Sequence, residues 1–433
     1  MIKNPFPTRG SYAVTPMLPT DRTLPERKIL SMFKHFMLND FIVDENSPKT
    51  KDGFRLAFRH LKQWDIDDGK IEVSHLTTSE SQGYGMMMLV YMAGCEDSLG
   101  LRPEQWLFGC DRLQDYYDAM LRSVLAFPSV EGNKLYAWQL YGYPREGGNQ
   151  TGYRENNGYK SAPFSIDPKA ASCATDGDMD IIFSLLLADE QWGGGAYDYR
   201  QIALDMLKSF WEYCVHPEHY TLLLGDWPPK RPEPLKSATR ISDFILGHLK
   251  AYARADKRYD WTRVANATYN VIRDLCEDKE VQNGLLPDFA VLENGRWKAP
   301  DGTILEEEDG SYFYNACRVP WRLGSDYLLY GDTPIGGGSL LKSVIRPLDE
   351  FAKSRNLDLL GPFRLDGTPM MDEGDANVFT AHFLVTAAAN AADSDWVDKL
   401  WNWHGLDEYN GDNYGDYLKF HSMLTAAGYT WQP

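Results

Sequence analysis

Two acidic side chains stand at the starts of two strongly apolar helical segments, where they could do acid–base chemistry. Glu80 lies in "TTSESQGYGMMM" (77–88), in which Ser79 and Gln82 fit a capping box before an apolar run. Asp176 lies in "ATDGDMDIIFSLLLADEQWG" (174–193), in which Thr175 or Asp176 itself can cap the helix. Acids are common at helix starts because the helix dipole stabilises a carboxylate. The pair becomes informative if both helices begin at one end of the molecule and face one cleft.

A pair of carboxyl groups in one cleft is what hydrolysis of a glycosidic bond requires. One group protonates the leaving oxygen, and the other activates water or attacks carbon. The acid needs a raised pKa, whereas a helix start lowers the pKa of a carboxyl group. Glu80 can therefore donate a proton only if burial, or a neighbouring carboxylate such as Asp176, outweighs the helix dipole.

The spacing of apolar residues predicts a mostly helical chain in two layers. Some segments are apolar nearly all round, such as 179–188, whereas others, such as 197–213, have one polar face. This alternation favours an inner ring of helices surrounded by an outer ring. The predicted helical segments are 22–43, 80–95, 103–125, 177–191, 198–215, 240–255, 260–276, 316–330, 338–354, 376–392, 394–403 and 413–427.

The long connections contain the less regular sequence. Residues 126–175 and 277–315 are rich in glycine, proline, asparagine and aromatic residues, and long ordered connections of this kind usually carry function. A short strand is predicted within 134–142. No linker-like or low-complexity tract interrupts the 433 residues, so we expect one domain over 1–433, with 1–20 as an N-terminal extension.

The composition excludes some classes of partner. A net charge of −18 argues against nucleic acid and against an anionic membrane surface, and it is compatible with a cationic or neutral ligand. No apolar run reaches membrane-spanning length. The 13 tryptophans and 25 tyrosines suit flat, partly apolar ligands such as sugars. No HExxH motif, phosphate-binding loop or GxSxG elbow occurs, so we expect no metal and no cofactor.

Several motifs together resemble glycoside hydrolase family 8. "SESQGYGM" is similar to the SEGxGYGM stretch of that family, and "ATDGDMDIIFSLLLADEQW" is similar to its signature around an active-site aspartate. The resemblance continues in the family's order from about residue 60 to 430, through "TRISDFILGHLKAY" (239–252), "GLLPDF" (284–289) and "YNACRVPWRLGSDYLLYGD" (314–332). Ser81 stands where glycine is usual, and Ile182 stands where alanine is usual. Neither change alters a carboxylate.

The resemblance implies an all-α (α/α)6 barrel, six inner and six outer helices, with a long cleft that binds β-1,4-linked polysaccharide and hydrolyses it with inversion. It makes Glu80 the proton donor and places Asp176 at the sugar that is cleaved. Where many members carry an aspartate base, this chain has Asn315, whose amide cannot take a proton from water. A branch with chitosanases and lichenases has asparagine there and a glutamate base in the preceding loop. "ILEEEDGSY" (304–312) offers Glu306, with Glu307 as the next candidate.

The remaining expectations concern binding and context. Arg318 and Arg322 would orient carboxylates, and several aromatic side chains could stack on sugar faces. The predicted substrate-binding residues are Trp138, Asp226, Trp227, Asp243, Tyr314, Asn315, Arg318 and Trp321. We expect a secreted monomer, although "MIKNPFPTRGSYAV" has no apolar leader segment.

The expected function is an inverting endo-β-1,4-glycanase. The favoured substrate is chitosan, followed by mixed-linkage β-1,3-1,4-glucan, with cellulose and xylan as alternatives. An alternative of a different functional class is a polysaccharide-binding barrel without catalytic activity. This alternative applies if no carboxylate of residues 306–309 reaches the cleft. A polysaccharide lyase would need a tyrosine or histidine base, and the two acidic motifs argue against it.

Overall fold

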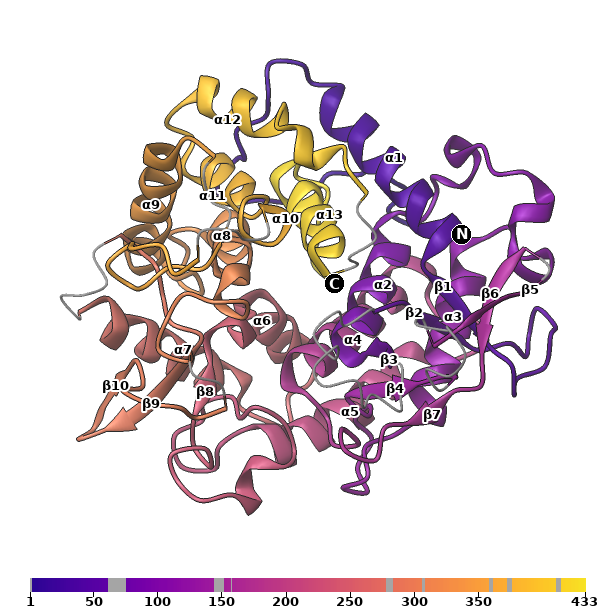
Figure 1. The fold of residues 1–433 in the computed structure, drawn as a ribbon, viewed down its shortest axis with the longest axis horizontal. Coiled ribbons are helices and arrows are strands. Elements are labelled where there is room, and N and C mark those ends of the chain that lie inside the picture. The colour runs from indigo at the N-terminus through magenta and orange to yellow at the C-terminus, as the bar shows by residue number, and fades with distance from the viewer. Residues whose placement is uncertain are drawn as a thin grey trace.

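An inner ring of helices organises the described chain. The computed structural model describes residues 2–60, 75–143, 152–156, 158–277, 283–305, 308–357, 361–371, 376–409 and 414–433. Within these ranges six helices contact one another in a closed cycle around the centre (Figure 1). In cyclic order they are α2 (Ser79–Tyr91), α4 (Thr175–Trp192), α6 (Leu246–Ala255), α8 (Val319–Tyr330), α11 (Phe383–Asn390) and α13 (Tyr414–Ala426).

A second set of helices packs against the outside of this ring. Each outer helix contacts an inner one, and its polar face is left exposed (Figure 1). The pairs are α1 (Leu24–Asn39) on α13, α3 (Leu113–Ala126) on α2, α5 (Tyr199–Cys214) on α4, α7 (Trp261–Cys276) on α6, α9 (Gly338–Arg355) on α8 and α11, and α12 (Ser394–Trp401) on α11. This packing fits the predicted all-α arrangement.

Several predicted helix bounds were wrong, each for a local reason. The segment 22–43 stops at Asn39, because Phe41 begins a strand. The segment 103–125 becomes helical at Leu113, after two short turns. The segment 240–255 begins with a single 3-10 turn, Ile241–Asp243, before α6. The segment 376–392 is two helices, α10 (Ala376–Phe379) and α11.

Short strands occupy the long connections. The predicted strand within 134–142 is present as β4 (Gln139–Tyr141), which lies between β3 (His75–Thr78) and β7 (Ser165–Ile166), antiparallel to both. A second sheet has the order β2-β1-β6-β5, in which β1 is antiparallel to β2 and parallel to β6. Its strands are β1 (Phe41–Asp44), β2 (Leu56–Phe58), β5 (Arg154–Asn156) and β6 (Tyr159–Ala162). The third sheet is β8 (Thr239–Arg240), β9 (Phe289–Glu293) and β10 (Arg296–Lys298).

The N-terminal extension forms the floor of the ring. Backbone N–H groups of residues 3–17 donate to carbonyls near the C-terminal ends of five inner helices, so those helices end on one side and begin on the other. The bonds are Lys3 to Gln191, Phe6 to Ala93, Gly10 to Gly428, Val14 to Leu328 and Met17 to Ala388, with N···O distances of 3.1, 2.8, 3.0, 2.9 and 2.9 Å. The helix starts therefore meet at the opposite end, which the two acidic motifs require.

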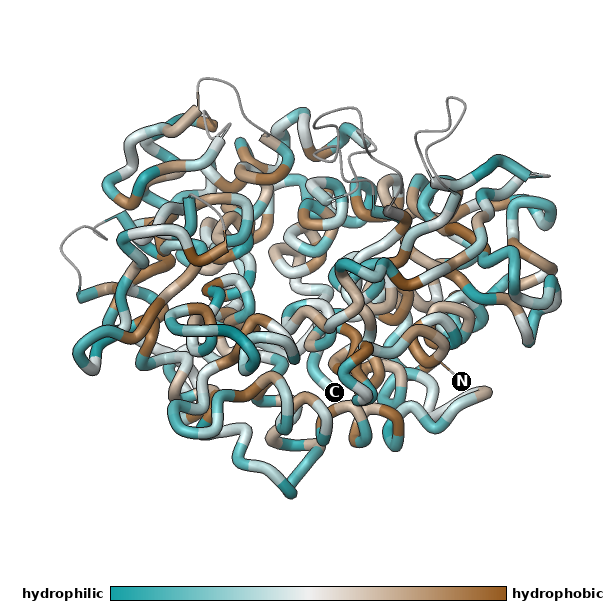
Figure 2. The backbone as a smooth tube through the Cα atoms, turned by 60° about the horizontal axis from the view of Figure 1, so that its bottom comes forward, coloured by the Kyte–Doolittle hydropathy of each residue, from teal (hydrophilic) through white to brown (hydrophobic). Residues whose placement is uncertain are grey.

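Hydropathy follows the two layers. Figure 2 shows hydrophobic stretches along the packed helices and hydrophilic stretches along many of the outer loops. No helix in the described ranges is both long enough and apolar enough to cross a bilayer.

Candidate active site

Two glycines allow α2 and α4 to pack closely enough to bring Glu80 beside Asp176. A Cβ atom on Gly177 would lie 2.3 Å from Ser79 Oγ and 2.5 Å from the Glu80 nitrogen, so no larger residue fits without movement. A Cβ on Gly83 would lie 2.7 Å from Asp180 Cβ. Each motif thus supplies an acid and the glycine that lets the other helix approach.

The helix starts are built differently from the predicted caps. Thr78, not Ser79, caps α2, because its hydroxyl accepts from the Ser81 N–H at 3.2 Å. Gln82 does not complete a capping box; its side chain accepts from the Phe58 N–H at 3.1 Å. At α4 neither predicted cap is used, since the Thr175 hydroxyl donates to the Leu223 carbonyl. Both starts are therefore fixed by neighbouring strands and loops.

Arg318 joins the two acidic side chains. Its Nη1 donates to Glu80 Oε1 and, at 2.7 Å, to Asp176 Oδ2. Its Nη2 donates to Ser242 Oγ at 2.7 Å. Arg318 stands at the residue before α8, so the starts of α2, α4 and α8 meet at one guanidinium. This confirms the expected proximity of Glu80 and Asp176, and Arg318 orients both.

The surroundings shift the pKa values of the two acids in opposite directions. The Glu80 side chain is 15% exposed and the Asp176 side chain 5%. Burial raises the pKa of Glu80, Arg318 opposes this, and the charge of Asp176 adds to the rise. Burial also acts on Asp176, but Arg318 and Arg240 outweigh it and lower the pKa of Asp176. Glu80 is therefore suited to carry a proton beside an ionised Asp176.

A second layer of polar side chains lies one helical turn below the first. Tyr84, Asp180 and Arg322 follow Glu80, Asp176 and Arg318 by four residues each, as the helical period requires. The Tyr84 hydroxyl donates to Glu80 Oε1 at 2.7 Å, and Arg322 Nη2 donates to Asp180 Oδ2 at 2.7 Å. Arg322 thus orients a carboxylate, as expected, although in the lower layer.

Arg240 and Asp243 extend the row of charges beyond Asp176. Arg240 Nη1 lies 3.6 Å from Asp176 Oδ2 and 3.7 Å from Asp243 Oδ1. Asp243 is fully buried, and this burial raises its pKa to about 7. The prediction that Asp243 is a polar cleft residue was therefore wrong; it is a buried partner of Arg240.

Asn315 bridges two charged groups, Asp288 and Arg318. Its Nδ2 donates to Asp288 Oδ2 at 2.8 Å, and its Oδ1 accepts from Arg318 Nη2 at 3.2 Å. Asp288 also accepts three backbone N–H groups of the turn that leads to Arg318, from Phe313, Asn315 and Ala316. The amide thus holds Arg318 and takes no proton.

The described residues on either side of the predicted base are hydrogen-bonded to one another. Glu306 and Glu307 lie outside the described residues. Directly after them, Asp309 is buried, and its Oδ2 accepts from the N–H groups of Ile304 and Leu305 at 2.6 and 2.7 Å. Asp309 therefore ties the backbone of Ile304 and Leu305 to its own carboxylate.

The predicted sugar-binding side chains fall into two groups. Trp138, Trp227 and Tyr314 are half-buried, so each presents part of its ring. The Trp138 carbonyl accepts from the Ser79 N–H at 2.8 Å, which places it next to Glu80.

Trp321 and Asp226 were wrongly predicted as substrate contacts. Trp321 is 5% exposed and is stacked on His421 inside the ring. Asp226 is buried and accepts from Ser129, Asn133 and the Cys173 N–H, so it ties loops together.

Sequence reasoning missed Tyr84, Arg240, Ser242 and Asp288. All four lie inside the quoted motifs. Only the structure shows that Tyr84 is hydrogen-bonded to Glu80, that Arg240 lies beside Asp176, and that Ser242 is hydrogen-bonded to Arg318.

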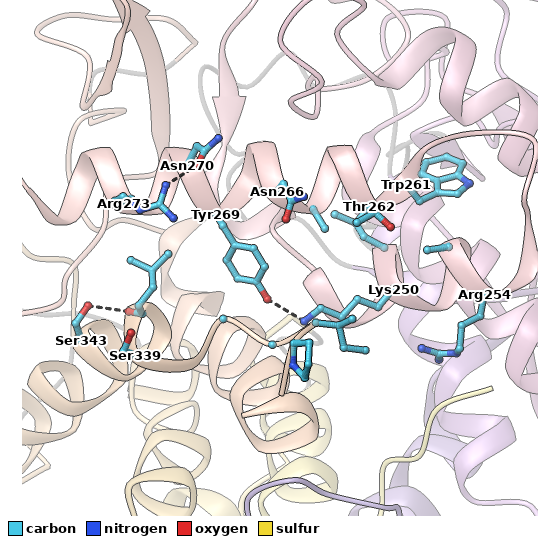
Figure 3. A pocket seen from close by; sticks show the side chains of 18 of the residues that line it. Lys250, Arg254, Trp261, Thr262, Asn266, Tyr269, Asn270, Arg273, Ser339 and Ser343 are labelled. Carbon is cyan, nitrogen blue, oxygen red and sulfur yellow. Dashed lines mark hydrogen bonds between the residues drawn. The ribbon is translucent and has the colours of Figure 1, made fainter. Parts of the chain in front are cut away.

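A groove lies in another part of the described structure. Figure 3 shows a groove of about 920 Å³ between α6, α7 and the segment 334–343, with Lys250 and Tyr269 hydrogen-bonded at 2.8 Å. None of the predicted site residues lines it. Nor do the described ranges bring together three histidine, cysteine, aspartate or glutamate side chains that could hold a metal ion.

A glutamate with a raised pKa, an aspartate with a lowered pKa and an arginine that contacts both are suited to acid-catalysed cleavage of a glycosidic bond. Comparison with known proteins identifies the family. Residues 159–336 match the model of glycosyl hydrolases family 8. The chain is 33% identical over 357 residues to a β-glucanase of Niallia circulans, covering 82% of this chain and 77% of that one. The chain belongs to glycosyl hydrolase family 8, as its motifs predicted.

Other relatives agree. An endoglucanase of Bacillus sp. (strain KSM-330) is 29% identical over 365 residues, 83% of this chain and 68% of that one. The apo structure of a β-1,3-1,4-glucanase from Paenibacillus sp. X4 superposes with a TM-score of 0.80 at 27% identity, covering 100% of both chains. A reducing-end-xylose releasing exo-oligoxylanase, at 17% identity, coverage of 95% of this chain and 94% of that one, and a TM-score of 0.63, shares the fold alone.

Proposed function

We propose that this glycosidase is an inverting endo-β-glucanase whose first substrate is mixed-linkage β-1,3-1,4-glucan. The observation that carries the proposal is the half-buried Glu80, which has a raised pKa and is hydrogen-bonded to Arg318 beside Asp176. Support for the substrate comes from two of the relatives given above, the β-glucanase at 33% identity and the β-1,3-1,4-glucanase at 27% identity with a TM-score of 0.80.

In the proposed reaction Glu80 protonates the glycosidic oxygen as the bond to the anomeric carbon breaks. Asp176 stays ionised and stabilises positive charge that develops on the sugar ring. A glutamate of the segment before Asp309, Glu306 or Glu307, takes a proton from the attacking water. Inversion requires an acid–base separation of about 6.5–9.5 Å, so that this water fits between them. Asn315 is excluded as base because an amide does not accept a proton at neutral pH.

The architecture proposed with this function is one (α/α)6 barrel domain over residues 1–433. The support is the closed cycle of inner-helix contacts, which runs from α2 to α13 and returns to α2. The first residues serve as its floor. Secretion remains part of the proposal, because a polymeric glucan is met outside the cell.

Chitosan is the second candidate substrate. The net charge of −18 suits a polycation, and the asparagine at 315 is found in the family branch that contains chitosanases.

The test is release of reducing ends from lichenan, chitosan, carboxymethyl cellulose and xylan, with proton NMR of the first product to record its anomer. We expect release from lichenan and an α-anomer product. The Glu80→Gln protein should lose activity by at least about a thousandfold while its circular dichroism spectrum is retained. Rapid release by the Gln variant would remove Glu80 as acid, and release from chitosan alone would replace the substrate.

A further inference from the structure

Five charged side chains alternate in sign across the starts of the inner helices. In order they are Asp243, Arg240, Asp176, Arg318 and Glu80, and we call this row the charge chain. Its links are 3.7 Å from Asp243 Oδ1 to Arg240 Nη1, 3.6 Å from Arg240 Nη1 to Asp176 Oδ2, 2.7 Å from Asp176 Oδ2 to Arg318 Nη1, and a hydrogen bond from Arg318 Nη1 to Glu80 Oε1.

The side chains of the charge chain are at most 15% exposed, so its net charge matters. Its three carboxyl groups and two guanidinium groups sum to −1 when all are ionised and to zero when one carboxyl group carries a proton. A buried net charge is costly, and the neutral state with one proton is therefore favoured. That proton has two possible carriers at the ends of the row, Glu80 and Asp243, since Asp176 is held ionised between two arginines.

Arg240 is the charged partner of Asp243. Its Oδ1 accepts a 3.5 Å hydrogen bond from Ser242 Oγ, and its Oδ2 has no hydrogen-bond partner in the described part of the chain. Its negative charge acts through Arg240 on Asp176, two links away from Glu80.

We propose that Asp243 and Arg240 are positioning residues for the hydrolysis: they balance the charges of Asp176 and Arg318 so that the single proton of the charge chain resides on Glu80. The inference rests on the proposed role of Glu80 as acid. Other titratable groups face the chain from neighbouring elements: Tyr84 from α2, Asp178 from α4, Arg322 from α8, and Tyr414 and Cys317 near Arg318. Burial raises the pKa of the two tyrosines and the cysteine, so these three stay neutral near pH 7, and burial also raises the pKa of Asp178.

The test is the pH dependence of kcat/KM on the polymer that the panel identifies. The basic limb of this profile reports loss of the proton from the acid. When the proton of the charge chain is on Glu80, Asp243 is ionised. Asp243→Asn then removes a negative charge and leaves the surroundings of Glu80 with one excess positive charge, so the basic limb should move to lower pH by about one unit.

Two double variants separate charge from structure. Asp243→Asn with Arg240→Gln again has balanced charge, so the limb should return towards its wild-type position. Asp243→Asn with Arg240→Lys keeps the excess positive charge, and its limb should stay low. Both disturb the geometry of the guanidinium equally, so a merely structural role would affect them alike.

The outcomes are distinct. If Glu80→Gln is inactive but none of these variants moves the limb, or the Gln and Lys double variants behave alike, the role of the charge chain is wrong while the acid stands. If Glu80→Gln remains active, the proposed function itself is wrong. Should Asp243→Asn fail to fold, the single variants Arg240→Gln and Arg240→Lys still test the proposal. Arg240→Gln should raise the pKa of Asp176 and move the acidic limb to higher pH, whereas Arg240→Lys should not.

Discussion

Replacing Gly177 with alanine should move Glu80 and Asp176 apart although neither acidic side chain is substituted. The new Cβ would lie 2.3 Å from Ser79 Oγ and 2.5 Å from both the Glu80 nitrogen and the Ser79 carbonyl carbon. A side-chain oxygen can turn aside, but backbone atoms cannot. An ordinary contact begins at 3.4 Å, so the α2 backbone must move by about 1 Å relative to α4.

The expected cost follows from two opposing effects. Alanine favours a helix over glycine by about 1 kcal/mol. Overpacking against backbone costs about 1–3 kcal/mol, so the clash outweighs the propensity and the variant should lose roughly 1 kcal/mol of unfolding free energy. The larger effect is on catalysis, because a shift of about 1 Å in a catalytic group typically costs about a hundredfold in rate.

Urea unfolding and reducing-end release measure the two effects. The matched control is Gly302→Ala, where nothing lies within 4 Å of the new Cβ, and both quantities should stay near those of the parent protein. A Gly177→Ala protein as stable and as active as the parent would refute the claim that this glycine sets the approach of α2 to α4.

Three other perturbations test different parts of the site. Tyr84→Phe removes a hydrogen bond that lowers the pKa of Glu80, so the basic limb of kcat/KM should move to higher pH; an unmoved limb would mean that the hydroxyl does not act on the acid. Asp309→Ala frees the N–H groups of Ile304 and Leu305, and kcat should fall by about 10–100-fold, whereas Asp301→Ala, at an exposed position of the same loop, should not change it. Burial lowers the pKa of His421 to about 3, so the folded state binds fewer protons than the unfolded state below about pH 6.5, and stability falls as pH falls. His421→Gln should reduce that slope of unfolding free energy against pH by up to about 1.4 kcal/mol per unit between pH 6 and 4, and an unchanged slope would show that another group is responsible.

The sequence by itself determined the helices, the family and the two acids. Apolar spacing predicted nearly every ring helix because a helix buried on all sides, such as α4, cannot avoid an apolar sequence. The motifs placed Glu80 and Asp176 at helix starts, and local sequence is sufficient for that. It was insufficient at helix ends, where a strand or a 3-10 turn formed through partners far along the chain, as at Phe41 and Ile241.

Tertiary structure alone decided what each polar side chain does. In the sequence, Trp321 and Asp243 are ordinary candidates for a cleft, yet both side chains are buried. Asp226 is hydrogen-bonded to residues of other loops, and the sequence does not show that these loops lie next to it. The pKa of Glu80 depends on burial and on Arg318 and Asp176, which stand at the starts of two other helices. Burial and charge are properties of neighbours in space, and a sequence motif names the acid without stating which groups will surround it.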